Sequence, residues 1–288
     1  MDEVYSSRGA ATAQRLRQAW ADRVAANRQQ AERLREEVDG GDHYQPLASA
    51  FRADPHRSGD SALEALRHIA LPDDIWVDIG AGAGRLALPL ALSVQQVIAI
   101  EPAPAMRTEL VNLQIEHGIS NITLRDERWP SDATAISGMA DVALISHVGY
   151  DIEQIGAFLD TMERAATREC VALLYDRAPG SLFWQVWPTI HGEQHARLPG
   201  AREFIELLKA RGALVDANEL ERRGDRQRFG FAEPEDAMDW ARRRLWLSEN
   251  SAKLPLLEQA VADLLIEQDG SWSLPDQPKQ MLIRWRAK

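Results

Sequence analysis

The chain has little cysteine, no long apolar run and no excess of positive charge. Cys170 is the only cysteine among 288 residues, which excludes an internal disulfide and a zinc site built from cysteines. A membrane span needs about 18 consecutive apolar residues, and no stretch of this sequence approaches that length. The opening MDEVYSSRGA has no apolar run of the signal-peptide kind. The net charge of −11 disfavours nucleic acid, whose phosphates are bound mainly by excess lysine and arginine. We therefore expect a cytoplasmic protein without nucleic-acid or membrane partners.

The sequence does contain enough apolar residues, 45%, to bury a sizeable core. In residues 10–38 the apolar positions recur at spacings of three, four and seven, which predicts an amphipathic helix. From residue 61 onward, short apolar runs alternate with amphipathic stretches, a pattern typical of a parallel sheet covered by helices on both faces. The expected strands are 75–79, 96–100, 122–124, 141–146 and 170–175, and the expected helices between them are 85–92, 103–117 and 152–166.

The remaining residues predict an elaboration of this doubly wound α/β domain. A helix at 201–211 and a strand at 214–222 are followed by two strongly patterned helices, 233–247 and 252–267, and by a terminal strand, 280–285. Because the two helices fall between two strands, we interpret residues 233–268 as a helical cap inserted in the domain. The expected organisation is an N-terminal helical extension, 1–60, and one domain, 61–288.

The most informative stretch is WVDIGAGAGRL, residues 76–86, in which three glycines directly follow an apolar run. Glycine lets the backbone approach a ligand closely and direct amide groups at it, although a tight turn would use the same residues. A dinucleotide fingerprint fits poorly, because Arg85 occupies the position of its third glycine. The lysine-containing phosphate loop is also missing.

The segment VDIGAGAG resembles the first motif of class I S-adenosylmethionine-dependent methyltransferases, and three later segments resemble that family in the expected order. They are VIAIEPAPAM, LRDERWP and DVALISHVGYD, which begin at residues 97, 124 and 141. The resemblance implies a Rossmann-like sheet of seven strands whose final strand is antiparallel, with S-adenosyl-L-methionine as the cofactor. It covers residues 61–176 well and departs from the family at Ala81, where cysteine or serine is common.

The resemblance also implies which residues hold the cofactor. Glu101 matches the acidic residue that binds both ribose hydroxyls, a role for which an ionised carboxylate is well suited. Asp126 matches the acidic residue near the adenine amino group, with Trp129 as an apolar wall, and Asp78 suits the ammonium end of the cofactor. The full predicted set is Asp78, Gly80, Ala81, Gly82, Gly84, Glu101, Pro102, Met106, Asp126, Glu127, Arg128, Trp129 and Ser146.

Three residues are candidates for catalysis: His147, Tyr150 and His191. His147 follows the fourth strand, whose end lies close to the methyl group in the family, so it could accept a proton from a substrate; it could also merely shape the pocket. His191 belongs to H-x-E-x-H in residues 183–200, whose alternate side chains would share one side of an extended chain. The spacing differs from the helical zinc motif H-E-x-x-H, Gly192 argues for a loop, and we expect no metal.

The sequence leaves the acceptor open. We expect methyl transfer to oxygen or nitrogen of a small molecule by in-line displacement, which depends mainly on positioning. Segments 178–200 and 233–268, together with the N-terminal segment, would select the acceptor. A protein-modifying methyltransferase and a non-catalytic cofactor-binding module are the alternatives, and the protein could be a monomer or a homodimer.

Overall fold

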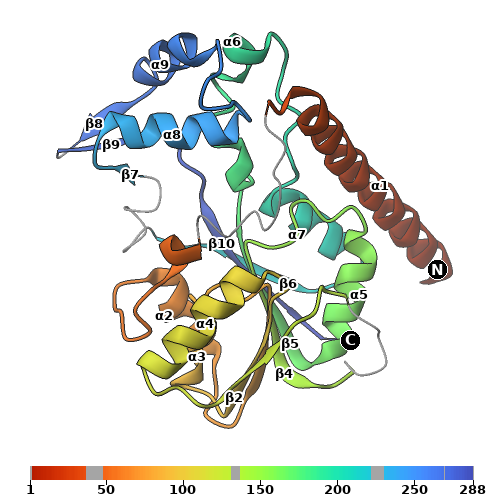
Figure 1. The fold of residues 1–288 in the computed structure, drawn as a ribbon. Helices are drawn as coiled ribbons and strands as arrows, with labels where there is room; N and C mark the ends of the chain where they lie inside the picture. The colour runs from red at the N-terminus through yellow and green to blue at the C-terminus, as the bar shows by residue number, and fades with distance from the viewer. Residues whose placement is uncertain (1, 37–47, 131–136, 222–229, 269, 288) are drawn as a thin grey trace.

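The computed structural model describes residues 2–36, 48–130, 137–221, 230–268 and 270–287. Its centre is a seven-stranded sheet with the order β3-β2-β1-β4-β5-β10-β6 (Figure 1). All pairings among the first five strands are parallel, whereas β10 is antiparallel to both β5 and β6. The strands are β1 (Ile75–Ile79), β2 (Gln96–Ile100), β3 (Ile122–Arg125), β4 (Ala140–Ser146), β5 (Ala166–Tyr175), β6 (Val215–Glu219) and β10 (Gln280–Arg286).

Helices cover both faces of this sheet, as the alternation in the sequence predicts. The covering helices are α2 (Ser61–Ile69), α3 (Ala87–Ala91), α4 (Pro104–Glu116), α5 (Ile155–Ala165) and α7 (Ala201–Ala210). One apolar core joins the sheet to α5 and α7 and the other joins it to α2, α3 and α4. Within β1, Val77 belongs to the first core and Trp76 to the second, because successive strand residues point to opposite faces. The predicted seven-stranded fold with an antiparallel final strand is confirmed.

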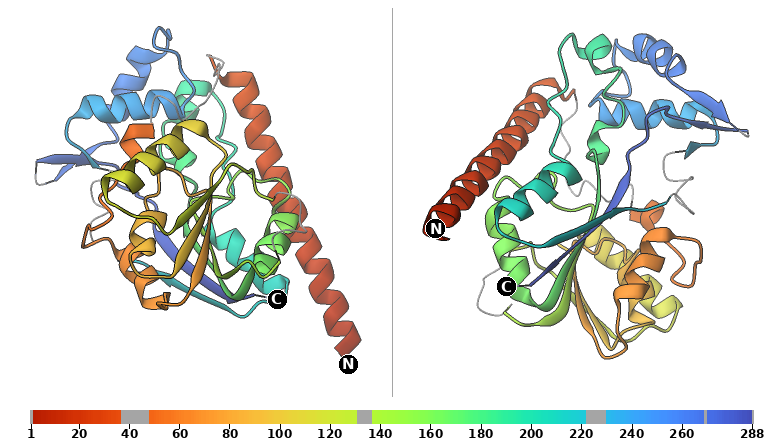
Figure 2. Two further views of the ribbon diagram at one scale, coloured as in Figure 1. Left: turned by 60° about the horizontal axis from the view of Figure 1, so that its bottom comes forward. Right: turned by 180° about the vertical axis from the view of Figure 1, so that it is seen from behind.

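The N-terminal helix α1 (Asp2–Leu34) is longer than predicted at its start and ends four residues earlier than Val38. It packs against α7 and α5, and its first turns extend beyond the rest of the molecule (Figure 2). Trp20 anchors it, with 3% of its surface exposed and its indole N–H donating to the carbonyl of Ile152 at 3.0 Å. A short 3₁₀ helix, η1 (Ala48–Phe51), lies against α4.

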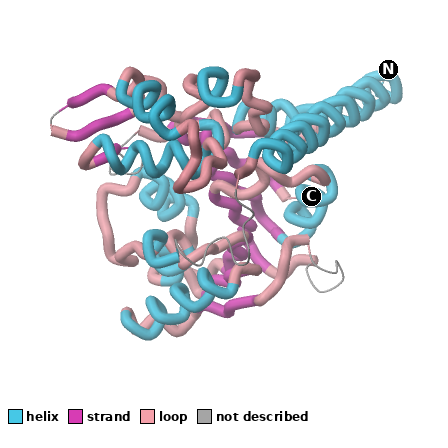
Figure 3. Tube along the Cα trace, turned by 45° about the horizontal axis from the view of Figure 1, so that its top comes forward, coloured by secondary structure: helices cyan, strands magenta, loops and turns pink. Residues whose placement is uncertain are grey.

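A third apolar core lies between residues that follow β5 and residues that precede β10. It includes α8 (Pro234–Arg244) and α9 (Leu254–Ala262), and also α6 (Trp187–His191), which follows the 3₁₀ turn η3 (Pro179–Ser181). A small antiparallel sheet of β7 (Gly230–Phe231), β9 (Ser271–Ser273) and β8 (Ile266–Gln268) accompanies these helices. The sequence predicted the two longer helices but not this sheet, and the prediction of helix up to residue 267 is wrong, because α9 ends at Ala262 and β8 begins at Ile266. Figures 1 and 3 show α6, α8 and α9 together on one side of the central sheet.

None of the described helices has both the length and the apolar character needed to cross a membrane.

Candidate active site

The glycine loop follows β1 at the point where the strand order reverses, since β1 lies between β2 and β4. In open α/β sheets, ligands bind in the crevice outside the carboxyl ends of strands at such a point. Gly80, Gly82 and Gly84 all have positive φ, of 78°, 56° and 83°. The amides of Gly80 and Ala81 both donate to the carbonyl of Ile100, at 2.8 and 3.1 Å, which fixes the loop to the end of β2.

The glycines of this loop have different surroundings. A Cβ on Gly80 would lie 2.5 Å from the side chain of Val148, and one on Gly84 would lie 2.8 Å from Leu88. A Cβ on Gly82 would meet no atom within 4 Å. The first and third glycines therefore permit close packing within the protein, whereas Gly82 faces open space that a ligand can occupy.

Glu101 organises the loop from the end of β2. Its two carboxylate oxygens accept from the amides of Gly82 and Ala103, each at 2.8 Å, and the residue is only 6% exposed. A carboxylate oxygen can accept more than one hydrogen bond, so Glu101 retains capacity for a ligand's hydroxyl groups. The same carboxylate thus sets the loop conformation and faces the site.

Asp78 is the most unusual group at this site. It is 2% exposed, and its Oδ1 is buried without a hydrogen-bond partner in the described structure. Burial, reinforced by the nearby carboxylate of Glu101, raises the pKa of Asp78 to about 7 from 3.8. An unpartnered buried carboxylate oxygen is costly, so the arrangement is suited to a cationic donor supplied by a ligand.

Arg107, on α4, joins the end of β2 to the segment after β3, and it was not among the predicted site residues. Its guanidinium donates to the carbonyls of Glu101 and Pro102 at 3.0 and 2.6 Å, and it forms a 2.6 Å ion pair with Asp126. Asp126 is exposed, which leaves its second oxygen open to a ligand. Met106, by contrast, is buried in a small apolar core and supports α4 beneath the loop.

The other predicted residues after β3 differ in exposure. Glu127 pairs with Arg125 at 3.8 Å, and Arg128 is exposed. Trp129 is 8% exposed, and its indole N–H contacts the carbonyl of Phe158 at 3.5 Å, so most of its ring supports the core.

The end of β4 places His147 beside Tyr150 of the same loop and beside Tyr175 and Gln280 of two other strands. The half-buried Ser146 ends β4, and His147 then adopts φ 56°, which is uncommon for a residue with a side chain. Its Nδ1 lies 3.3 Å from the hydroxyl of Tyr150, and its Nε2 lies 3.2 Å from the side-chain amide nitrogen, Nε2, of Gln280. Its ring stacks on Tyr175, with the two ring centroids 4.2 Å apart.

The hydroxyl of Tyr150 also accepts the backbone N–H of Tyr175 at 2.6 Å, and Tyr150 is 6% exposed. The structure therefore brings His147 and Tyr150 together, as part of one network. Gln280 was missing from the predicted site, because it lies at the start of β10, far from residue 147 in the sequence. In the sheet, however, Gln280 is opposite Tyr175 in the antiparallel register.

H-x-E-x-H, residues 191–195, begins at the last residue of a helix and continues in the loop after it, as Gly192 indicates. Residues 187–191 form the helix α6, with Pro188 in its first turn and Gly192 at its end in the left-handed conformation, φ 72°. Proline at a helix start and glycine just after its end are a favourable pair, and they set the bounds of this short helix.

The side chains of this motif consequently have different partners. His191 Nε2 lies 2.9 Å from the carbonyl of Leu245, whereas Glu193 forms a 2.6 Å ion pair with Arg33 of α1. His195 stacks on an indole ring of α6. Within the described ranges, no group of three or more His, Cys, Asp or Glu side chains is arranged to hold a metal ion.

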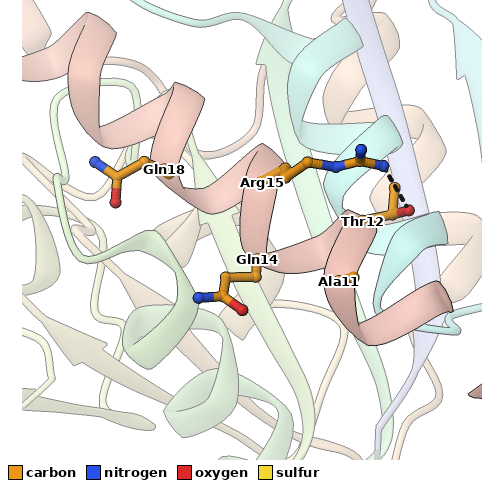
Figure 4. Close-up of a pocket in the computed structure, with 5 residues that line it drawn as sticks. All are labelled: Ala11, Thr12, Gln14, Arg15 and Gln18. Carbon is orange, nitrogen blue, oxygen red and sulfur yellow. Dashed lines mark hydrogen bonds between the residues drawn. The ribbon is translucent and has the colours of Figure 1, made fainter. Parts of the chain in front are cut away.

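A shallow depression on α1 offers none of this chemistry (Figure 4). One internal hydrogen bond, from Arg15 to Thr12 at 3.2 Å, crosses it. The side chains that line it come from a single helix and are exposed, except for the half-buried Thr12. They are Ala11, Thr12, Gln14, Arg15 and Gln18.

No family model matches the chain. In sequence it is 33% identical, over 112 residues, to a protein of Methanothermobacter thermautotrophicus named probable cobalt-precorrin-6B C(15)-methyltransferase (decarboxylating). The alignment covers 36% of this chain and 57% of that protein, so the chain matches little more than half the length of this curated relative.

Solved structures resemble the whole domain more evenly. YcgJ from Bacillus subtilis is 15% identical with a TM-score of 0.52, and the match covers 79% of this chain and 98% of YcgJ. A Bacillus halodurans protein provisionally assigned to the methyltransferases is 13% identical with a TM-score of 0.53, and the match covers 79% and 99%. The [4+2]-cyclase SpnF is 16% identical with a TM-score of 0.51, and the match covers 88% and 85%. Together with the strand order and the glycine loop, these likenesses show that the chain has the fold of the class I S-adenosylmethionine-dependent methyltransferases.

Proposed function

We propose that this protein transfers the methyl group of S-adenosyl-L-methionine to oxygen or nitrogen of a small molecule. The observation that carries the proposal is the group formed by Asp78, Gly82 and Glu101: a buried carboxylate without a donor, an open glycine and a second carboxylate with spare lone pairs. The sequence similarity to a methyltransferase supports the same reading. A ligand that fits this group needs an ammonium for Asp78, a surface that can lie close to the backbone at Gly82, and a diol for Glu101. S-adenosyl-L-methionine has all three.

When bound, the cofactor supplies a methyl group on a positively charged sulfur, with S-adenosylhomocysteine as the product after transfer. Asp78 would receive the ammonium, Glu101 the ribose hydroxyls and Asp126 the adenine amino group. The backbone at Gly80, Ala81 and Gly82 would line the cofactor. Pro102, Met106 and Trp129 would support this surface, and Glu127, Arg128 and Ser146 would border it.

His147 is the proposed proton acceptor from the substrate. Both of its ring nitrogens contact protein groups, so taking a proton requires one of these contacts, to Tyr150 or to Gln280, to be exchanged for the substrate. Tyr150 is better suited to orienting this ring, because its hydroxyl already accepts the Tyr175 amide. His191 contacts Leu245 beside α6, so its proposed part is in acceptor recognition.

Incubation with methyl-labelled S-adenosylmethionine and a cell extract divided by ultrafiltration tests the proposal. Label in a new low-mass compound, separated by chromatography from S-adenosylmethionine, supports a small-molecule acceptor, and label in the protein fraction supports the protein-modifying alternative. His147→Asn is the matched variant, and it should reduce labelling while leaving cofactor affinity near that of the wild type. Cofactor binding without label in any new compound or in protein would favour a different use of the fold, as the likeness to a [4+2]-cyclase illustrates.

A further inference from the structure

The segment between β5 and α7 contains several buried polar atoms that have no hydrogen-bond partner. A buried polar group without a partner costs its full desolvation, and native proteins keep few of them, each requiring an explanation. Their concentration in residues 184–195 indicates a segment that an additional molecule would stabilise. The atoms are Trp184 Nε1, Gln185 Oε1, Trp187 Nε1, His191 Nδ1 and His195 Nδ1.

These atoms offer uncharged donors and acceptors. The Nε2 of His191 must donate to the carbonyl of Leu245, so in the neutral ring its Nδ1 is an acceptor. Burial lowers the pKa of His191, and burial together with Arg197 lowers the pKa of His195 to about 4, so both rings are neutral at pH 7. The indole N–H groups of Trp184 and Trp187 are donors.

The same segment provides flat aromatic surfaces. The ring of Trp187, 1% exposed, stacks with His195 at a centroid distance of 4.1 Å and lies 4.5 Å from the ring of His191. Trp246, from the turn between α8 and α9, meets Trp187 edge-on at 4.9 Å. Rings from two separate segments of the chain therefore surround one indole.

Backbone strain gives a second, independent observation. Among the described residues, only His147 and Trp246 combine a side chain with positive φ, which is 59° for Trp246. A bulky residue in this conformation is a genuine outlier, and such strain is concentrated at active sites and ligand clamps. The carbonyl of Trp246 accepts the amide of Glu36 at 3.0 Å, which holds this turn against the end of α1.

The segment is also linked to the end of β4. Tyr175 stacks on His147, and it belongs to the same apolar core as Phe183 and Trp187. Side chains in continuous contact thus run from His147 to the indole of α6, which places this cluster on the substrate side of the proposed methyl-transfer site.

We propose that Trp184, Trp187, His191, His195 and Trp246 bind the methyl acceptor, and that this acceptor is an uncharged planar compound with a hydrogen-bond donor and acceptor on one edge. The inference rests on the proposed function. The indoles donate to the compound and the imidazole nitrogens accept from it. Since the polar atoms are covered in this structure, entry requires α6 to separate from the α8–α9 turn, with loss of the contact between His191 and Leu245.

The test measures binding of 2-quinolone, which carries an N–H beside a carbonyl, to the protein without cofactor. Quinoline has the same rings without that N–H, and 2-naphthoate has a charge. We expect 2-quinolone to bind about tenfold more tightly than either compound, because the site's acceptors remain unpaired without the N–H and a charge would be desolvated. Absence of 2-quinolone binding, or equal binding of the three, would overturn the inference.

His195→Phe is the decisive variant, because it keeps a ring against Trp187 and removes a buried nitrogen that has no partner. It should raise Tm, since replacing an unsatisfied polar group by an apolar one is neutral or stabilising. It should also weaken the binding of 2-quinolone about tenfold, because one hydrogen-bonding atom of the site is lost. Trp272→Phe, in β9, is the matched control and should leave 2-quinolone affinity unchanged. A lower Tm with unchanged affinity for His195→Phe would assign the cluster to folding alone.

This experiment is separable from the test of methyl transfer. Quinolone binding with the expected variant pattern, but no binding of S-adenosylmethionine, would support the site and refute the proposed function. Cofactor binding and methyl transfer without quinolone binding would support the proposed function and refute the acceptor site.

Discussion

The buried carboxyl of Asp78 should make cofactor affinity depend on pH. Its pKa of about 7, against 3.8 in an unfolded chain, means that ionisation in the folded protein costs on the order of 4 kcal/mol more than in water. If the cofactor's ammonium binds the ionised carboxylate, the proton must leave first. Affinity should therefore fall about tenfold from pH 8 to pH 6, because protonation competes with binding below the pKa.

The same shift predicts a change in stability with the opposite sign. The pKa of Asp78 is raised in the folded state, so the folded protein binds this proton more tightly than the unfolded chain does. The corresponding stabilisation is complete below pH 3.8 and is lost as the pH rises through about 7. Asp78→Asn removes this titration and should raise the free energy of unfolding at pH 8.

Calorimetric titration with S-adenosylmethionine at pH 6, 7 and 8 measures the cofactor affinity of the wild type and of Asp78→Asn. Denaturant unfolding at the same pH values measures their free energies of unfolding. We expect a pH-dependent affinity for the wild type and a weak, nearly constant one for the variant. Equal wild-type affinity at pH 6 and pH 8, or a variant that is less stable at pH 8, would refute the reasoning about this carboxyl.

Four other substitutions test separate parts of the structure. Gly80→Ala should lower Tm more than Gly82→Ala in thermal unfolding, because both strain a positive φ but only the first also causes a clash; equal losses would contradict these packing differences. His147→Asn should lower kcat more than it weakens cofactor binding, and wild-type turnover would reject its role as a base. Arg211→Met should lower the free energy of unfolding by about 3–5 kcal/mol, because it leaves the buried carboxylate of Glu163 without its 2.8 Å ion pair. Denaturant unfolding measures this loss, and a value below about 1 kcal/mol would contradict it.

The central sheet could be predicted because its strands are buried on both faces and read as short apolar runs between amphipathic helices. The glycine loop was predictable for a similar reason: Asp78 and Glu101 interrupt or close apolar runs, where a carboxylate has no structural explanation of its own. In both cases the signal lies in consecutive residues.

What the sequence could not predict depends on contacts between distant residues. The strands of the small sheet, such as β7 at Gly230–Phe231, are too short to show an alternating pattern. Gln280 reaches His147 only because β10 pairs antiparallel with β5, and Arg107 acquires its partners only when α4 packs beside β3. The contact of His191 with Leu245 was equally out of reach, because the two residues are 54 positions apart in the chain.

The first experiment to make is calorimetric titration of the wild type and of Glu101→Gln with S-adenosylmethionine, S-adenosylhomocysteine and NAD, because it shows whether the glycine loop binds a methyl donor. We expect the wild type to bind both adenosyl compounds and not NAD. Glu101→Gln keeps the shape of the side chain but loses its charge, and it should bind both adenosyl compounds about tenfold more weakly. Binding of NAD alone, or adenosyl binding that is unaffected by Glu101→Gln, would contradict a methyl-donor site at the glycine loop.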